Sequence, residues 1–172
     1  NQMIASRIAG GVIWSYGNAT TAPYTEQCYI GGANSVRAFS ARSIGPGGYP
    51  PETDRKYTYI NHVGDIRIEA NVEYRFRILG DLHGAIFLDA GNVWLMRKDK
   101  DRPDGQLTLK NFPKQIALGT GFGLRYDLDF LVFRLDLGIG LHDPYDTGKS
   151  GYYNIPKFKD SMALHFAIGY PF

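Results

Sequence analysis

Cysteine is almost absent from the 172-residue sequence, which contains only Cys28. A single cysteine excludes an internal disulfide framework and a CxxC metal-binding pair. An excess of one charge is also lacking, because 19 Lys and Arg residues against 17 Asp and Glu residues leave a formal net charge of +2. The basic residues are scattered among acidic ones and form no stripe, so the sequence lacks the electrostatic footprint of a nucleic-acid-binding protein.

Long apolar runs are missing as well. No stretch of 18 or more apolar residues predicts a transmembrane helix, and no basic segment followed by an apolar core marks a signal peptide. The chain opens with NQMIASRIAGG, as if in the middle of a strand, which indicates a processed protein or a fragment. The lack of helical spans still allows a membrane protein that crosses the bilayer with strands.

Motifs of catalytic and metal sites are lacking too. The 4 histidines show no HxxxH or HExxH spacing, and there is no GxSxG elbow. The run DKDRPDG at 99–105 has one residue too many for a calcium loop and lacks its closing glutamate. The alternative is an enzyme, an outer-membrane protease or lipase in which His142 and Asp143 would form an acid–base pair. Neighbouring residues on a strand point to opposite faces, however, so these two side chains would not form a direct hydrogen bond. We therefore expect no enzyme activity, no metal and no cofactor.

What the sequence does contain is a repeated alternation of apolar and polar residues. Segment 63–79, VGDIRIEANVEYRFRIL, has apolar residues at even positions from Ile66 to Ile78 and polar residues at odd positions from Asp65 to Arg77. This period of two predicts a β-strand with one apolar and one polar face. The same pattern recurs, more weakly in the first case, in segments 5–16, 82–95, 116–126, 130–141 and 162–172. The sequence thus predicts six strands and no helix.

The predicted strands are long for a soluble protein. A soluble strand has about 5–6 residues, whereas a tilted transmembrane strand has about 9–11. Aromatic residues near strand ends match the aromatic girdle of an outer-membrane barrel; they are Trp14, Tyr16, Trp94, Tyr126, Tyr170 and Phe172. The soluble alternative is a β-sandwich or lipocalin-like barrel, in which the apolar face would form the core.

The lengths of the connections favour the membrane interpretation. Long connections at 17–62, 97–113 and 142–160 alternate with short ones at 79–82 and 127–129. Outer-membrane barrels alternate in this way between long outer loops and tight periplasmic turns. We therefore predict an all-β, antiparallel transmembrane β-barrel. Because single-chain bacterial barrels have at least about eight strands, six strands are either the C-terminal part of a larger barrel or the first loop contains further strands.

An arginine in the first long loop is a candidate functional residue. Arg37 lies in GGANSVRAF at 31–39, while Glu73 and Asp89 lie on the predicted polar faces of two successive strands. A guanidinium group can engage two carboxylates together, and lysine replaces it poorly. Glu69 has the same facing as Glu73, and the arginine could instead be solvated or contact lipopolysaccharide phosphates. The residues alone leave these possibilities open.

The order and spacing of several motifs resemble the C-terminal region of the BamA- and TamA-type family, the bacterial surface antigen superfamily of outer-membrane assembly and translocation proteins. Val36, Arg37 and Phe39 match its VRGF or VRGY signature, with Ala38 in place of the usual glycine. Phe87, Asp89 and Gly91 match an FxDxG pattern. The other matching segments are VEYRF, GTGFGLRYDLDFLVFRLDLG and the terminal IGYPF. The stretch SARSIGPG is most similar to lipoprotein-type TamA relatives of Bacteroidetes.

The resemblance implies a sixteen-stranded barrel of which residues 1–172 form about the last six strands. The loop 17–62 would fold into the lumen, where Val36, Arg37 and Phe39 would form a latch against Glu73, Asp89 and Gly91 on the wall. The last strand would serve as the C-terminal assembly signal and as one side of a seam that opens toward lipid, through Phe166, Ile168, Gly169, Tyr170 and Phe172. Gly169 would permit a kink, although close packing explains a strand glycine equally well.

The function implied by the resemblance is assembly, insertion or translocation of proteins in the bacterial outer membrane by barrel gating. The implied partners are outer-membrane lipid and lipopolysaccharide, unfolded outer-membrane protein clients, and periplasmic or lipoprotein assembly partners that bind absent N-terminal domains. The alternative is a two-partner-type secretion transporter or a passive pore.

Overall fold

The computed structural model describes residues 2–19, 22–51 and 61–172; residues 20–21 and 52–60, which belong to the predicted loop 17–62, lie outside the described residues. The described residues form six strands and two short 3-10 helices, η2 (Phe112–Gln115) and η3 (Phe158–Ser161). The strands are β1 (Gln2–Val12), β2 (Ile66–Leu79), β3 (Leu82–Trp94), β4 (Ala117–Asp127), β5 (Val132–His142) and β6 (Met162–Ile168). The prediction of six strands and an all-β fold is confirmed.

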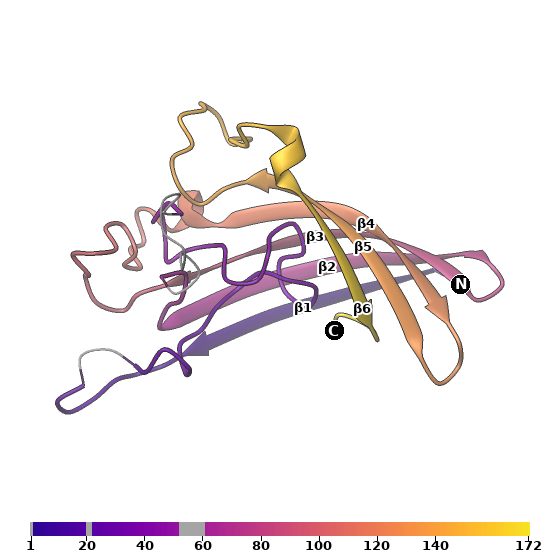
Figure 1. The fold of residues 1–172 in the computed structure, drawn as a ribbon, viewed down its shortest axis with the longest axis horizontal. Coiled ribbons are helices and arrows are strands. Elements are labelled where there is room, and N and C mark those ends of the chain that lie inside the picture. The colour runs from indigo at the N-terminus through magenta and orange to yellow at the C-terminus, as the bar shows by residue number, and fades with distance from the viewer. Residues whose placement is uncertain (1, 20–21, 52–60) are drawn as a thin grey trace.

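All six strands belong to one sheet in the order β1-β2-β3-β4-β5-β6, and every neighbouring pair is antiparallel (Figure 1). In the described part of the chain, the outer edges of β1 and β6 have no partner strand. The first strand lies earlier than the predicted segment 5–16, because its register with β2 runs from Gln2 opposite Phe76 to Val12 opposite Ile66. The predicted segment runs further because the alternation of apolar and polar residues continues through Trp14 and Tyr16, which lie beyond the last paired residue, Val12.

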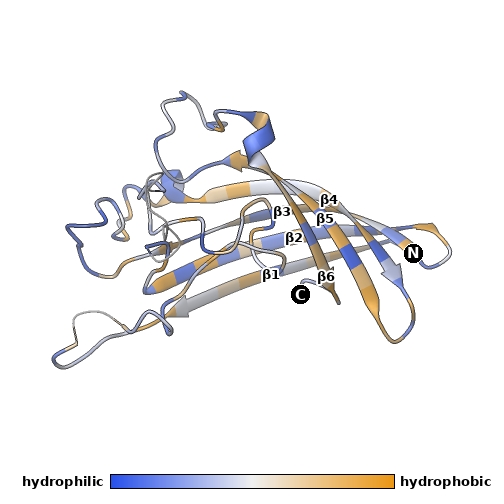
Figure 2. Ribbon diagram, in the orientation of Figure 1, coloured by the Kyte–Doolittle hydropathy of each residue, from blue (hydrophilic) through white to orange (hydrophobic). Residues whose placement is uncertain are grey.

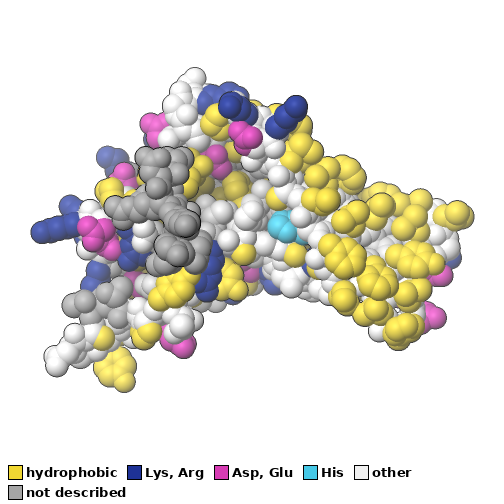
Figure 3. All heavy atoms as spheres, viewed as in Figure 1, with side chains coloured by type: hydrophobic (Ala, Val, Ile, Leu, Met, Phe, Trp, Pro, Cys, Tyr) yellow, Lys and Arg dark blue, Asp and Glu magenta, His cyan; other side chains and the backbone are white. Residues whose placement is uncertain are grey.

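The two faces of the sheet have the polarity that the alternation predicts. Apolar side chains such as Ile86, Leu124 and Phe166 are exposed, whereas charged side chains such as Glu73 and Arg125 are buried on the other face. Figure 2 shows the alternation along the strands, and Figure 3 shows hydrophobic side chains gathered over one end of the sheet. A soluble protein buries apolar residues and seldom fully buries charged ones, so this arrangement argues against the soluble sandwich.

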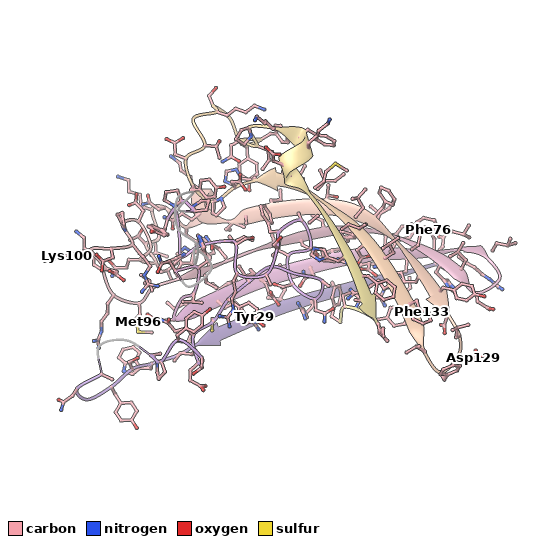
Figure 4. All side chains as sticks on the ribbon, viewed as in Figure 1. Tyr29, Phe76, Met96, Lys100, Asp129 and Phe133 are labelled. Carbon is pink, nitrogen blue, oxygen red and sulfur yellow. The ribbon has the colours of Figure 1, made fainter. Side chains whose placement is uncertain are left out.

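Long and short connections lie at opposite ends of the sheet, as predicted. The long connections 13–65, 95–116 and 143–161 join their strands at one end of the sheet, and the turns 80–81 and 128–131 lie at the other (Figure 1). In Figure 4, Lys100 lies at the loop end and Asp129 at the turn end. Residues 13–19, 22–51 and 61–65 contain one isolated bridge, Cys28 with Gly64, but no strand. None of the described residues forms a helix long and apolar enough to cross a membrane.

Trp94 departs from the expected aromatic girdle. Trp94 is fully buried, because its ring stacks on Phe112 of η2 at a centroid distance of 5.2 Å and its indole Nε1–H donates to Gln115 Oε1 at 3.0 Å. By contrast, Trp14, Tyr16, Tyr126 and Tyr170 are exposed. Trp94 therefore joins a strand end to the connection 95–116 instead of facing the surroundings of the sheet.

The exposed apolar face gives a test of the membrane interpretation. Leu88 lies near the middle of β3 and is 46% exposed. If this face contacts lipid, Leu88→Arg destabilises the folded protein by about 2–4 kcal/mol, measured as urea unfolding in phospholipid vesicles. The control Leu109→Arg changes a leucine that is 93% exposed in the connection 95–116 and leaves the unfolding free energy unchanged. Equal effects of the two substitutions would contradict a lipid-facing surface.

Candidate functional site

Residues between Cys28 and Ile44 of the connection 13–65 pack onto the polar face of the sheet. Apolar residues of this connection join residues from β3 and β4 in a buried cluster, consisting of Ile30, Val36, Ile44, Val93 and Ala117, with Cys28 and Phe39 packed against it. The predicted latch residues Val36 and Phe39 therefore make apolar contacts on each side of Arg37. These contacts hold the segment 36–39, called the loop tip below, against strands whose neighbouring positions are charged.

Arg37 is fully buried and bound by residues of two strands. Its Nε and Nη2 donate to the two oxygens of Asp89 on β3 at 2.8 and 2.9 Å, and its Nη1 donates to Glu73 on β2. Its backbone N–H also donates to Asp89 at 3.0 Å. The guanidinium carbon lies 3.6 Å from the centroid of the Phe87 ring. The structure thus brings together the arginine and both carboxylates singled out in the sequence.

The ambiguity between Glu69 and Glu73 is resolved by the register of β2. Glu69 accepts hydrogen bonds from Arg7 at 2.6 Å and from the Ser35 hydroxyl at 2.5 Å, and so holds the residues before the loop tip. Asn71, between the two glutamates on the same face, donates to Asp89 at 2.9 Å and to the Ser35 carbonyl at 2.9 Å. The polar face of β2 therefore binds successive residues of the loop, and Glu73 is the glutamate that pairs with Arg37.

Three further charged residues complete the buried network, and sequence reasoning did not select them. Arg125 on β4 contacts Glu73 at 3.1 Å and Asp136 at 2.5 Å, while Asp136 on β5 lies 3.7 Å from Arg37. Arg134 lies 3.4 Å from Asp136 and donates to Asn34 at 2.5 Å. Their polar positions within the alternation of β4 and β5 were the available signal. The residues around them are mostly glycines, which gave no indication that a loop covers these strands.

Glycines on the wall allow the loop tip to approach the strand backbones. A Cβ on Gly138 of β5 would overlap the Arg37 carbonyl, and a Cβ on Gly119 of β4 would overlap the Ala38 methyl group. A Cβ on Gly91 of β3 would lie 2.5 Å from Ile30 Cδ1 and 2.7 Å from the Ile68 carbonyl oxygen. Gly91 is therefore a place of close packing rather than a partner of Arg37.

Ala38, the one departure from the signature, fits without strain. Among the residues that the structure describes, the non-glycine residues with positive φ are Arg42, Asp104 and Asp129, so Ala38 does not occupy a backbone conformation that requires glycine. Its methyl group is buried over Gly119. Alanine is tolerated in the loop because the facing wall position is a glycine.

The C-terminal residues do not continue the last strand as predicted for 162–172. β6 ends at Ile168, and Gly169 adopts φ +86 with no atom near its Cβ position, so its backbone conformation and not close packing explains the glycine. After this turn, the Tyr170 ring lies 4.5 Å from the Arg75 guanidinium carbon and the Phe172 ring lies 5.3 Å from that of Arg7. Phe166 and Ile168 remain on the exposed apolar face. The five predicted signal residues are thus divided between two environments.

The chemistry of the site is electrostatic. Its carboxylates are paired with arginines, and the described residues contain no group of three or more His, Cys, Asp or Glu side chains placed to hold a metal. Both ring nitrogens of His142 face backbone carbonyls, those of Tyr152 and Lys114. Burial raises the pKa of the adjacent Asp143 carboxyl, against smaller opposite effects of Tyr145 and His142. The arrangement around Arg37 is suited to holding a loop in place.

The contact between Gly138 and the loop tip predicts a sharp effect of one methyl group. Gly138→Ala should displace residues 37–38 and weaken loop docking by about 1–3 kcal/mol, the usual cost of overpacking. Hydrogen exchange of the loop-tip amides measures the change. The control is Gly10→Ala on β1, where a Cβ meets only the Arg67 carbonyl oxygen at 3.7 Å. Unchanged loop exchange in Gly138→Ala would show that the loop does not rest on β5.

Comparison with known proteins gives a family assignment that agrees with this arrangement. No curated protein matches the chain. Residues 1–172 match the Omp85 superfamily domain, so the match extends over the whole sequence. The six-stranded antiparallel sheet is consistent with part of an Omp85 β-barrel, and the family works in the assembly or translocation of proteins at the bacterial outer membrane. The chain therefore belongs to the Omp85 superfamily.

Proposed function

We propose that the chain is part of an outer-membrane factor that inserts or translocates protein clients by gating its barrel, with Arg37 as the latch of the connection 13–65. The observation that carries this proposal is the complete burial of Arg37 between Asp89 and Glu73. Removing one member of a buried ion pair leaves the other charge uncompensated, at a cost of about 3–5 kcal/mol. A loop held in this way stays docked until a competing interaction releases it.

The latch is suited to gating because it is built from groups on separate elements. Arg37 comes from a connection, whereas Glu73, Asp89 and Asp136 come from three different strands of the sheet. A change in the spacing of these strands alters the ion-pair distances and hence the docking free energy. An unfolded client that displaces a strand would thereby loosen the loop, and the loop would in turn restrict access to the polar face while it remains docked.

The proposed partners follow from the surfaces of the sheet. The exposed apolar face would contact outer-membrane lipid, and the connections 95–116 and 143–161 would lie at the outer surface near lipopolysaccharide. Unfolded outer-membrane proteins would be the clients. Periplasmic or lipoprotein partners would bind domains that precede the barrel in a full-length protein. Such a protein would have sixteen strands and resemble the BamA- and TamA-type members, including the lipoprotein type of Bacteroidetes.

The second candidate function is a two-partner-type secretion transporter or a passive pore, because the charged polar face would also line a conducting channel. The full-length precursor separates these functions. Several periplasmic repeats with a lipid-anchor cysteine favour assembly, whereas two repeats encoded beside a secreted partner favour dedicated secretion.

The latch is tested by Arg37→Ala in the full-length protein reconstituted in phospholipid vesicles. We expect the strands to remain folded and the docked-to-undocked ratio of the loop to fall more than about 100-fold, since 3 kcal/mol or more is lost. Limited proteolysis of the connection 13–65 measures docking, and the folding rate of an added outer-membrane protein measures activity. Arg37→Lys should be nearly as impaired, because lysine lacks the fork that binds two carboxylates.

The matched control is Arg42→Ala in the same connection. Arg42 stacks on Tyr24 and Tyr29, with guanidinium-to-ring distances of 4.7 and 4.6 Å, and these partners lie in its own connection. Its removal should leave client folding at the wild-type rate. Full client-folding activity in Arg37→Ala would refute the latch. Increased ion conductance without any effect of either form on client folding would favour the passive pore.

A further inference from the structure

The last strand, β6, is the shortest of the six strands in the described part of the chain. β6 has 7 residues and pairs only with β5, from Phe133 opposite Ile168 to Ile139 opposite Met162. Along its polar face the side chains are those of Ala163, His165 and Ala167, so His165 is the one polar side chain that β6 directs toward the site. The contact made by His165 is therefore the only side-chain hydrogen bond available on that face of β6.

His165 binds the backbone of the loop tip. Its Nε2 lies 2.9 Å from the carbonyl oxygen of Arg37. Because a carbonyl oxygen can only accept, Nε2 carries the proton and donates. The carbonyl reaches this position because β5 has Gly138 at the point where it passes, and a side chain there would overlap it. Gly138 pairs with Ala163 and Asp136 pairs with His165, so the contact crosses from β6 over β5.

Arg37 thus joins elements that are far apart in the sheet. Its guanidinium and its N–H bind Asp89 and Glu73 on β3 and β2, while its carbonyl accepts from His165 on β6. The two sets of contacts act on the same residue, so an Arg37 held by its carboxylates presents the carbonyl in a fixed place. An Arg37 released from them withdraws the acceptor of His165.

We propose that His165 is a positioning residue that couples the docked state of the loop tip to β6, so that undocking of Arg37 loosens β6 from β5. This inference rests on the proposed latch and adds the path by which the latch acts on the last strand. β6 depends on that path because it is a short strand of 7 residues and His165 supplies the one polar side chain on its polar face. A client strand that competes for β6 would therefore meet less resistance once the loop has undocked.

The coupling is tested by hydrogen exchange of the β6 amides, residues 162–168, in the full-length protein in phospholipid vesicles. Loss of one hydrogen bond in His165→Ala should raise β6 exchange about 2- to 10-fold. His165→Gln should restore slow exchange, because the glutamine side-chain amide places a donor near the position of Nε2. The control is His83→Ala on β3, whose ring contacts the Asp81 carbonyl in the adjacent turn and should leave β6 unchanged.

The combination with Arg37→Ala separates coupling from a local structural role. Arg37→Ala alone should also raise β6 exchange, and adding His165→Ala to it should raise exchange no further, since coupled residues are non-additive. Equal exchange in His165→Ala and His165→Gln, or an undiminished effect of His165→Ala in the Arg37→Ala background, would overturn the inference.

Failure of the proposed assembly function would be seen in the rate of client folding, whereas failure of the coupling would be seen in the hydrogen exchange of β6. If the β6 exchange data are non-additive but Arg37→Ala folds clients at the wild-type rate, the coupling stands and the assembly function fails. If Arg37→Ala abolishes client folding while β6 exchange stays at the wild-type level in every variant, the latch stands and His165 has no coupling role.

Discussion

Burial of the Arg37 charge is the constraint on which the rest of the site depends. A guanidinium removed from water must find carboxylates at the right distance, and the sheet supplies them from β2 and β3, with Asp136 of β5 further away. Arg125 and Arg75 balance Glu73 in turn. Gly119 of β4 and Gly138 of β5 leave room for the loop tip, which occupies the volume that a side chain at either position would need.

The sequence was most informative where its residue pattern has the two-residue period of a β-strand. Alternation with a period of two identifies strands, their faces and the charged positions facing the site, so Glu73 and Asp89 could be named before any contact was known. Arg125, Arg134 and Asp136 had the same facing, but nothing local indicates which charges a distant loop will cover. The choice between Glu69 and Glu73 needed the register of the sheet and the path of the connection 13–65, which are tertiary properties.

Two predictions failed because tertiary contacts and backbone conformation differ from what the local alternation of apolar and polar residues predicts. Trp94 has the spacing of a surface aromatic, but the connection 95–116 folds over it, and no periodicity encodes the position of a connection. The alternation of 162–172 continues through Gly169, yet the positive φ of this residue turns the last side chains toward Arg75 and Arg7. A glycine in a strand pattern is compatible with either a strand or a turn, and the letters alone do not distinguish them.

The placement of Glu73 and Asp89 on one face of two strands also bears on how the protein reaches its folded state. A one-residue slip between strands sends every side chain of the slipped strand to the opposite face. In such a misregistered sheet one carboxylate would point away from Arg37, and the arginine could not be buried. The loop can thus dock only on a correctly registered sheet. The ion-pair network therefore selects for correct strand pairing as well as holding the loop in place.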